Sequence, residues 1–237
     1  MRLQSERHGG ILRLVLDRTD RANAYDRALL ATLEEHLVKA EADPPAVVLL
    51  QSAGDGAFCA GADQKEQVET PFLEALNLRS QQVFTRLARL PSVSIAAIQG
   101  AAVGGGLELA LACDLRVAGP GARFWLPETA LGIIPAAGGC SRLAALIGLS
   151  RAKEMILGGR VLDAPTALSW GLVHRVADDP RGEAQRWAEE LLKRDPVAQR
   201  LAKELLDREE ADRSLAAERT VASMLYARRG GALSRSE

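Results

Sequence analysis

The 237-residue chain has no strong excess of charge of either sign and no long uninterrupted apolar run. Its 30 basic and 31 acidic side chains are interspersed and leave a formal net charge of −1. A chain without a dominant sign gives no electrostatic basis for binding nucleic acid or an anionic membrane. The most apolar window, Ile95–Cys113, contains Gln99, Glu108 and four glycines. We therefore expect no nucleic-acid partner and no membrane partner, and a buried strand–turn–helix in this window.

Cysteine is also scarce: Cys59, Cys113 and Cys140 are far apart, odd in number and without a CxxC pair. This pattern indicates neither a disulfide framework nor a metal cage, and it suits reduced thiols in the cytosol. The segment Met1–Glu6 has no apolar core like that of a signal peptide. We therefore expect a cytoplasmic protein that holds no metal.

Patterns typical of strands alternate with helical periodicity as far as about residue 118, and the remainder is mostly helical. This order predicts an α/β fold with buried parallel strands. The expected strands are Ile11–Asp17, Ala46–Leu50, Ser94–Gln99, Leu115–Ala118 and Val173–Val176. The expected helices are one capped by Asp26, a long region ending near Leu90, the segment that carries Glu108, and residues 142–147, 151–157, 164–170, 181–193, 196–208 and 211–228.

Two acids, Glu108 and Glu128, lie in the most core-like part of the chain beside glycine-rich backbone. A buried ionised carboxylate is costly unless something satisfies it, so acids in such a place are candidates for chemistry. Gly61-Ala62-Asp63 follows an expected strand, and Gly104-Gly105-Gly106 leads into an expected helix. The first N–H groups of a helix lack intrahelical acceptors and carry partial positive charge. Two such groups converging on one carbonyl oxygen would form an oxyanion hole.

An oxyanion hole without a nucleophile suits enolate chemistry, and no Ser-His-Asp or Cys-His pattern stands out. The three histidines, His8, His36 and His174, lie outside these motifs and fit surface or structural roles. Glu108 and Glu128 would then supply the acid and base, since of two close carboxylates one can stay protonated.

Residue chemistry alone leaves plainer interpretations open. Glu108 could complement the dipole of its own helix, and Glu128 could be a solvated acid paired with Arg123. The glycines could serve turns and packing, because they match neither GxGxxG nor GxxxxGK[ST]. On this basis an enzyme and an α/β binding module remain alternatives.

Three longer motifs add a family resemblance. They are Phe58–Glu66 (FCAGADQKE), Ala96–Glu108 (AAIQGAAVGGGLE) and the segment from Leu126 through Glu128 to Gly139. In this order and spacing they closely resemble the crotonase (enoyl-CoA hydratase/isomerase) family, over about residues 10–208. Supporting matches are Arg18 with Asn23-Ala24, Ala112–Arg116 and Gly171–Val173.

The resemblance implies a crotonase-like spiral of ββα units with a helical C-terminal region. Residues 1–180 would form the spiral core with the active site, and residues 181–237 a helical trimerisation region. It also implies a homotrimer or a hexamer (a dimer of trimers). No cofactor would be bound permanently, and coenzyme A would arrive as part of an acyl thioester substrate.

Carried over by motif, the N–H groups of Ala62 and Gly105 would polarise the thioester carbonyl. Ala62, Asp63, Gln64 and Lys65, with Gly105, would line the coenzyme A path. Glu108 would orient and deprotonate a water for addition at Cβ, and Glu128 would deliver a proton to Cα. The implied activity is that of an enoyl-CoA hydratase, adding water reversibly across the 2,3-double bond.

Several positions depart from the family pattern. Trp125 stands where glycine is common, Ala136 stands where a second glycine is common, and Tyr25 stands where leucine is usual. The alternatives within the family are an isomerase and a biosynthetic dehydratase or decarboxylase. A non-catalytic relative that binds acyl-CoA or RNA is the alternative of a different class.

Overall fold

A computed structural model describes residues 2–63, 65–66 and 78–207. In this part of the chain the larger sheet has the strand order β1-β2-β3-β4-β6-β9. Its strands are β1 (Leu3–His8), β2 (Ile11–Leu16), β3 (Val47–Ser52), β4 (Val93–Ile98), β6 (Leu115–Ala118) and β9 (Arg175–Val176). Only the β1–β2 pair is antiparallel among these neighbours, and the other pairs are parallel. The expected α/β fold with buried parallel strands is therefore confirmed.

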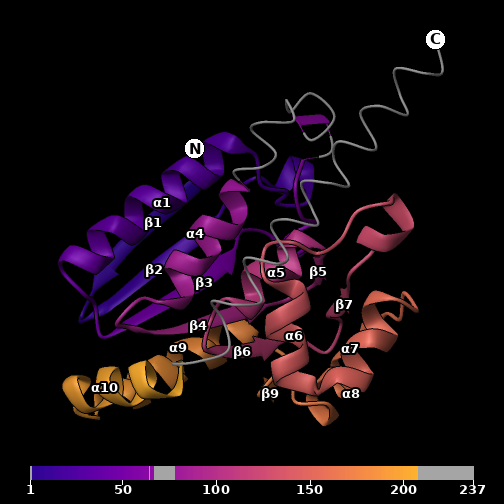
Figure 1. Cartoon of the computed structure of the whole chain (residues 1–237). Coiled ribbons are helices and arrows are strands. Elements are labelled where there is room, and N and C mark those ends of the chain that lie inside the picture. Colours follow the sequence, from indigo (N-terminus) through magenta and orange to yellow (C-terminus); the bar gives the residue numbers. More distant parts are fainter. Residues whose placement is uncertain (1, 64, 67–77, 208–237) are drawn as a thin grey trace.

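A smaller sheet, in the order β5-β7-β8, lies beside it. It consists of β5 (Ala101–Val103), β7 (Arg123–Trp125) and β8 (Leu162–Asp163). Strand β4 continues into β5 and then into α5 (Gly105–Leu111), while β6 continues into β7 and later α6 (Gly139–Ile147). Each such unit gives one strand to each sheet before its helix (Figure 1). This is the expected spiral of ββα units.

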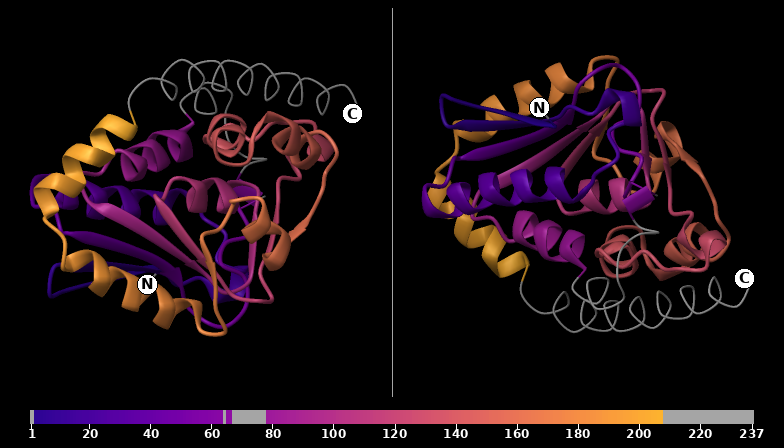
Figure 2. Two further views of the ribbon diagram at one scale, coloured as in Figure 1. Left: turned by 90° about the horizontal axis from the view of Figure 1, so that it is seen from below. Right: turned by 90° about the horizontal axis from the view of Figure 1, so that it is seen from above.

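Helices cover both faces of the larger sheet. Helices α1 (Arg27–Ala42) and α4 (Arg79–Ala88) lie on one face, and α9 (Pro180–Leu192) packs on the other (Figures 1 and 2). In β3, Val48 and Leu50 join the core under α1, whereas Val47 and Leu49 join the core under α9. A strand buried on both faces reads as a continuous apolar run, which is why the sequence at 46–50 predicted it.

Asp26 begins α1 as expected, because its side chain accepts a hydrogen bond of 2.8 Å from the Leu29 N–H. Three later helices, α8 (Ala164–Ser169), α9 and α10 (Pro196–Leu206), begin in the same way, each with an aspartate cap and an early proline. The remaining described helices are α7 (Leu149–Ile156) and the 3₁₀ turns η1 (Thr19–Arg21) and η2 (Glu128–Leu131). No helix among the described residues is both long and apolar enough to cross a membrane.

The sequence did not predict strands β1, β5, β7 and β8. The last three have only two or three residues, too few for a periodic pattern. The expected helix at 211–228 and part of the region before Leu90 lie outside the described residues. The boundary between domains at residue 180 falls where α9 begins and stays a prediction.

Candidate active site

The segment Gly61–Asp63 runs alongside Tyr25. The Tyr25 N–H donates to the Gly61 carbonyl at 2.8 Å, and the Asp63 N–H donates to the Tyr25 carbonyl at 2.8 Å. Tyr25 and Ala62 thus form a parallel bridge. In an extended segment alternate N–H groups point to opposite sides. The N–H of Ala62 therefore points away from Tyr25.

Gly105 is the first residue of α5, so its N–H lacks an acceptor within the helix and carries partial positive charge. The two glycine-rich segments meet here. A β-carbon at Gly61 would lie 3.4 Å from the Gly105 nitrogen and 3.0 Å from the Val103 carbonyl oxygen. The fold thus brings the Gly61–Asp63 segment and the beginning of α5 into contact, as an oxyanion hole made from Ala62 and Gly105 requires.

Glu108 lies one turn into α5, where its N–H donates to the Gly104 carbonyl at 3.0 Å. Its side chain is buried, with 3% of the residue exposed. Carboxylate oxygen Oε1 accepts hydrogen bonds from the N–H groups of Ala137 at 2.7 Å and Gly139 at 2.8 Å. These donors lie at the beginning of α6, where backbone N–H groups stabilise negative charge. Glu108 is therefore oriented and satisfied as a carboxylate.

Glu128 begins the 3₁₀ turn η2 and is 7% exposed. Its Oε1 lies against Gly104, where a β-carbon would be only 2.6 Å away. Its Oε2 is buried and has no hydrogen-bond partner among the described residues. Desolvation by burial raises the pKa of Glu128 to about 7, from an ordinary 4.5. Glu128 can therefore hold a proton near neutral pH.

The two acids flank the same turn but have opposite surroundings. Oε1 of Glu128 touches Gly104, and the carbonyl of Gly104 accepts the hydrogen bond from the Glu108 N–H. Helix donors satisfy Glu108, whereas burial favours the neutral form of Glu128. Environments that separate the protonation states of two carboxyl groups assign one to the base and the other to the acid. Such a pair beside two backbone donors can polarise a carbonyl and move protons next to it.

The plain interpretation of Glu128 as a solvated acid paired with Arg123 is wrong. Glu128 is buried, and Arg123 donates to the Ala122 carbonyl at 3.0 Å. Glu108 does lie in the first turn of its own helix, but its carboxylate contacts the beginning of α6 instead.

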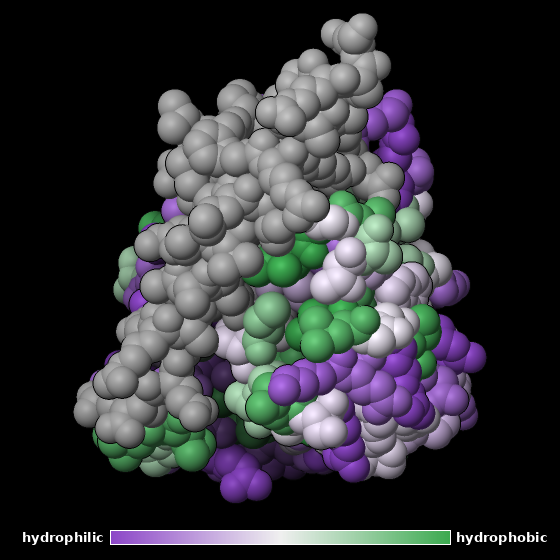
Figure 3. Space-filling view, turned by 45° about the vertical axis from the view of Figure 1, so that its right-hand side comes forward, coloured by the Kyte–Doolittle hydropathy of each residue, from purple (hydrophilic) through white to green (hydrophobic). Residues whose placement is uncertain are grey.

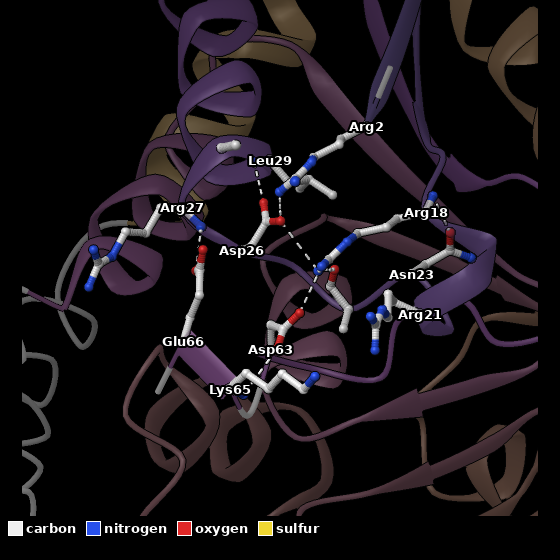
Figure 4. Close-up of polar contacts among 12 residues, drawn as sticks. Arg2, Arg18, Arg21, Asn23, Asp26, Arg27, Leu29, Asp63, Lys65 and Glu66 are labelled. Carbon is white, nitrogen blue, oxygen red and sulfur yellow. Dashed lines mark hydrogen bonds and ion pairs between the residues drawn. The ribbon is translucent and has the colours of Figure 1, made fainter. Parts of the chain in front are cut away.

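Asp63 turns towards Arg18 (Figure 4). The Arg18 guanidinium lies 2.8 Å from the Asp63 carboxylate and 3.4 Å from that of Asp26. The hydrogen bond from Arg18 holds the pKa of Asp63 below its ordinary value. Lys65 donates its backbone N–H to Asp63 at 3.1 Å. Gln64 lies outside the described residues, and the coenzyme A contacts expected of Asp63, Gln64 and Lys65 stay predictions.

Sequence reasoning missed the roles of two arginines, although both lie in the quoted motifs. Arg18 ties Asp63 to the cap of α1. Arg116, with 1% exposed, donates to the carbonyls of Cys113 at 2.6 Å and Leu172 at 2.7 Å. It thereby fixes the end of the helix that carries Glu108, and burial lowers its pKa to about 10.

Comparison with known proteins supports the resemblance read from the motifs. Residues 6–235 match the family model described as enoyl-CoA hydratase/isomerase. The chain is 42% identical over 194 residues to probable enoyl-CoA hydratase 2, mitochondrial, of Arabidopsis thaliana, covering 80% of this chain and 64% of that protein. It is 40% identical over 206 residues to mouse methylglutaconyl-CoA hydratase, mitochondrial, covering 81% of this chain and 64% of that protein.

Solved structures agree with the sequence matches. A crystal structure of enoyl-CoA hydratase from Bacillus anthracis superposes with a TM-score of 0.84 at 35% identity, covering 96% of this chain and 90% of that one. The expected fold is confirmed by this likeness. The chain belongs to the enoyl-CoA hydratase/isomerase family.

Proposed function

We propose that this protein is an enoyl-CoA hydratase that adds water reversibly across the 2,3-double bond of an enoyl-CoA thioester. The observation that carries the proposal is the pair of unlike buried acids beside two backbone donors. Oε1 of Glu108 accepts hydrogen bonds from two backbone N–H groups, and Glu128 has a pKa raised to about 7. Both flank the turn that presents the N–H of Gly105.

In the proposed reaction the thioester carbonyl accepts hydrogen bonds from the N–H groups of Ala62 and Gly105. These donors stabilise the negative charge that develops on oxygen, and losing one donor of this kind typically costs roughly 3–4 kcal/mol in the barrier. Glu108 takes a proton from water while the water oxygen bonds to Cβ. Glu128 gives its proton to Cα. The product gains one OH and one H, and the two glutamates exchange their protonation states. The site is reset when Glu108 releases a proton to solvent and Glu128 takes one up from solvent.

Coenzyme A enters this scheme only as part of the substrate, and no resident cofactor is required. An isomerase moves a proton between two carbons and needs no second acid for water, so two suitably placed acids favour hydration. The description of the family names both hydratases and isomerases, so the assay must distinguish the two reactions.

The proposal includes self-association into trimers or hexamers, with the helical region at residues 181–237 as the expected contact and a second, partly apolar surface on α6 and α7. The face that carries α6 and α7 shows apolar side chains among polar ones (Figure 3). The exposed members are Leu146, Leu149, Leu157, Val161 and Leu168. Exposed apolar patches mark contact surfaces with other proteins. Sedimentation of the purified protein measures the oligomeric state directly.

The activity is tested with crotonyl-CoA and with branched and aromatic enoyl-CoAs in water labelled with ¹⁸O. We expect loss of the enoyl absorbance and one ¹⁸O atom in the product. Proton exchange and double-bond migration without ¹⁸O would identify an isomerase. A folded protein that acts on none of these thioesters would refute the proposal. Glu35→Gln is the matched control for variants of the two acids, because Glu35 is an exposed glutamate on α1.

A further inference from the structure

Tyr25 contacts both halves of the proposed oxyanion hole. It is buried, with 7% exposed, and its main chain pairs with Gly61 and Asp63 on either side of Ala62. Its side chain reaches the other half. A β-carbon at Gly105 would overlap the phenol oxygen of Tyr25 and would lie 2.8 Å from Cζ and 2.9 Å from Cε1. The hydroxyl end of the ring therefore occupies the space that a side chain at Gly105 would need.

The ring of Phe84 holds the Tyr25 ring in this contact with Gly105. The ring of Tyr25 meets the ring of Phe84 edge to face, with centroids 5.5 Å apart and an interplanar angle of 88°. Such an arrangement is favourable for aromatic pairs and restricts the ring. Phe84 itself is fully buried on α4. The phenol is thus held against the first residue of α5.

The main chain of the Ala62 segment has a second support. Asp63, which follows Ala62 in the chain, is held by an ion pair of 2.8 Å between its carboxylate and the guanidinium of Arg18. The backbone hydrogen bonds of Tyr25 do not depend on which side chain it carries. Replacing the side chain therefore perturbs the contact with Gly105 while leaving the Ala62 segment held.

We propose that Tyr25 is a positioning residue that sets the distance between the two N–H donors of the oxyanion hole, through its phenol on Gly105 and its backbone on Ala62. The inference rests on the proposed function, because it takes Ala62 and Gly105 as the donors to the thioester carbonyl. An oxyanion hole works only while its donors are aimed at the position the oxygen occupies in the transition state. A displacement of about 1 Å can cost a large factor in rate. Leucine at this position would have no atom that replaces the phenol oxygen.

The test compares Tyr25→Phe and Tyr25→Leu with the wild type. The readouts are kcat and KM for hydration, the dissociation constant of a saturated acyl-CoA, and the carbonyl stretching frequency of the bound enoyl thioester. Because the donors polarise that carbonyl, its frequency shift on binding reports their aim. We expect Tyr25→Leu to lower kcat by roughly 10- to 100-fold, a part of the loss seen when a donor is removed. Its carbonyl shift should shrink, while the affinity for the saturated acyl-CoA stays within about threefold.

Tyr25→Phe keeps the ring and removes only the oxygen, so we expect a smaller loss of kcat, in the same direction, with a smaller change of the carbonyl shift. Trp187→Leu is the control for losing an aromatic ring. Trp187 is a residue of α9 and packs against the separate core cluster between α9 and the larger sheet. This control should leave the carbonyl shift unchanged. Thermal unfolding of all variants shows which of them are folded.

The outcomes separate this inference from the proposed function. If the wild type hydrates no thioester, the proposed function fails first. If the wild type is active and both Tyr25 variants keep its kcat and carbonyl shift, the positioning role is refuted while the proposed function stands. The role is refuted as well if Trp187→Leu changes the carbonyl shift as much as Tyr25→Leu does. Should Tyr25→Leu fail to fold, an unchanged carbonyl shift in Tyr25→Phe alone refutes the role.

Discussion

The raised pKa of Glu128 has a consequence for stability that can be measured without substrate. Burial raises this pKa to about 7 from an ordinary 4.5, so the folded state binds the Glu128 proton more tightly than the unfolded state does. The contribution of the protonated group is fully present below pH 4.5 and is lost as the pH rises through about 7. The difference between the two values corresponds to about 3 kcal/mol.

The variant Glu128→Gln removes this contribution, since glutamine is neutral at every pH. Relative to the wild type, its free energy of unfolding should increase between about pH 4.5 and pH 7 and level off above, by up to about 3 kcal/mol. Urea titrations of both proteins at several pH values measure the difference. Because the difference between wild type and variant is used, every other titrating group cancels.

One such group, His174, titrates in the same range with the opposite sign. Burial, with a smaller contribution from Arg116, lowers the pKa of His174 to about 4 from 6.5. Its contribution is present above pH 6.5 and is lost as the pH falls towards about 4. The wild type alone would therefore give a flattened profile. Parallel profiles for wild type and Glu128→Gln would refute the assignment of a raised pKa to Glu128.

Three further predictions concern activity. Hydration should slow as the pH rises through about 7, because Glu128 must be protonated to donate, and a pH–kcat profile that stays flat across this range would contradict its role. Glu108→Gln should lower kcat by roughly 10²- to 10⁴-fold with little change in the dissociation constant of a saturated acyl-CoA, as measured by calorimetry. Gly104→Ala should lower kcat more than Gly132→Ala. Both glycines have positive φ (52° and 72°), but only a β-carbon at Gly104 would meet the Glu128 carboxylate, at 2.6 Å. Equal losses of kcat would show that backbone strain alone causes the effect.

Local signals made much of the fold predictable. Strand β6 was predicted at Leu115–Ala118, the residues it occupies. The beginning of α1 was predictable because the capping side chain of Asp26 and its donor, the Leu29 N–H, are only three positions apart in the sequence. Strand β1 was missed since only Leu3 of its six residues is buried, so it carries no alternation. Strands β5 and β7 owe their existence to pairing with each other, which no short window of sequence contains.

The sequence predicted which two acids belong to the site, but not that their surroundings differ. Glu108 and Glu128 were selected because acids in apolar segments are costly. Which of them is satisfied depends on where α6 begins, since Ala137 and Gly139 reach Glu108 from another unit of the spiral. The Arg18–Asp63 pair joins residues 45 positions apart. Contacts of this kind arise from the packing of units, and a single sequence carries no trace of them.

The glycines of the site are explained by the side chains that approach them. The φ angle of Gly104 is positive, and a β-carbon there would strike Glu128; at Gly105 it would strike Tyr25; at Gly139 it would lie 2.9 Å from Oε1 of Glu108. Each of these glycines thus lies against a proposed catalytic acid or the tyrosine proposed to position the donors, and a β-carbon at Gly139 would also lie 2.6 Å from Cβ of Pro135. Turn formation alone would not require glycine at Gly105 or Gly139, which have no positive φ. At Gly104, Gly105 and Gly139 the absent side chains therefore make the room in which the carboxylates and the phenol lie against the backbone, whereas Gly106 leaves room for Cys59.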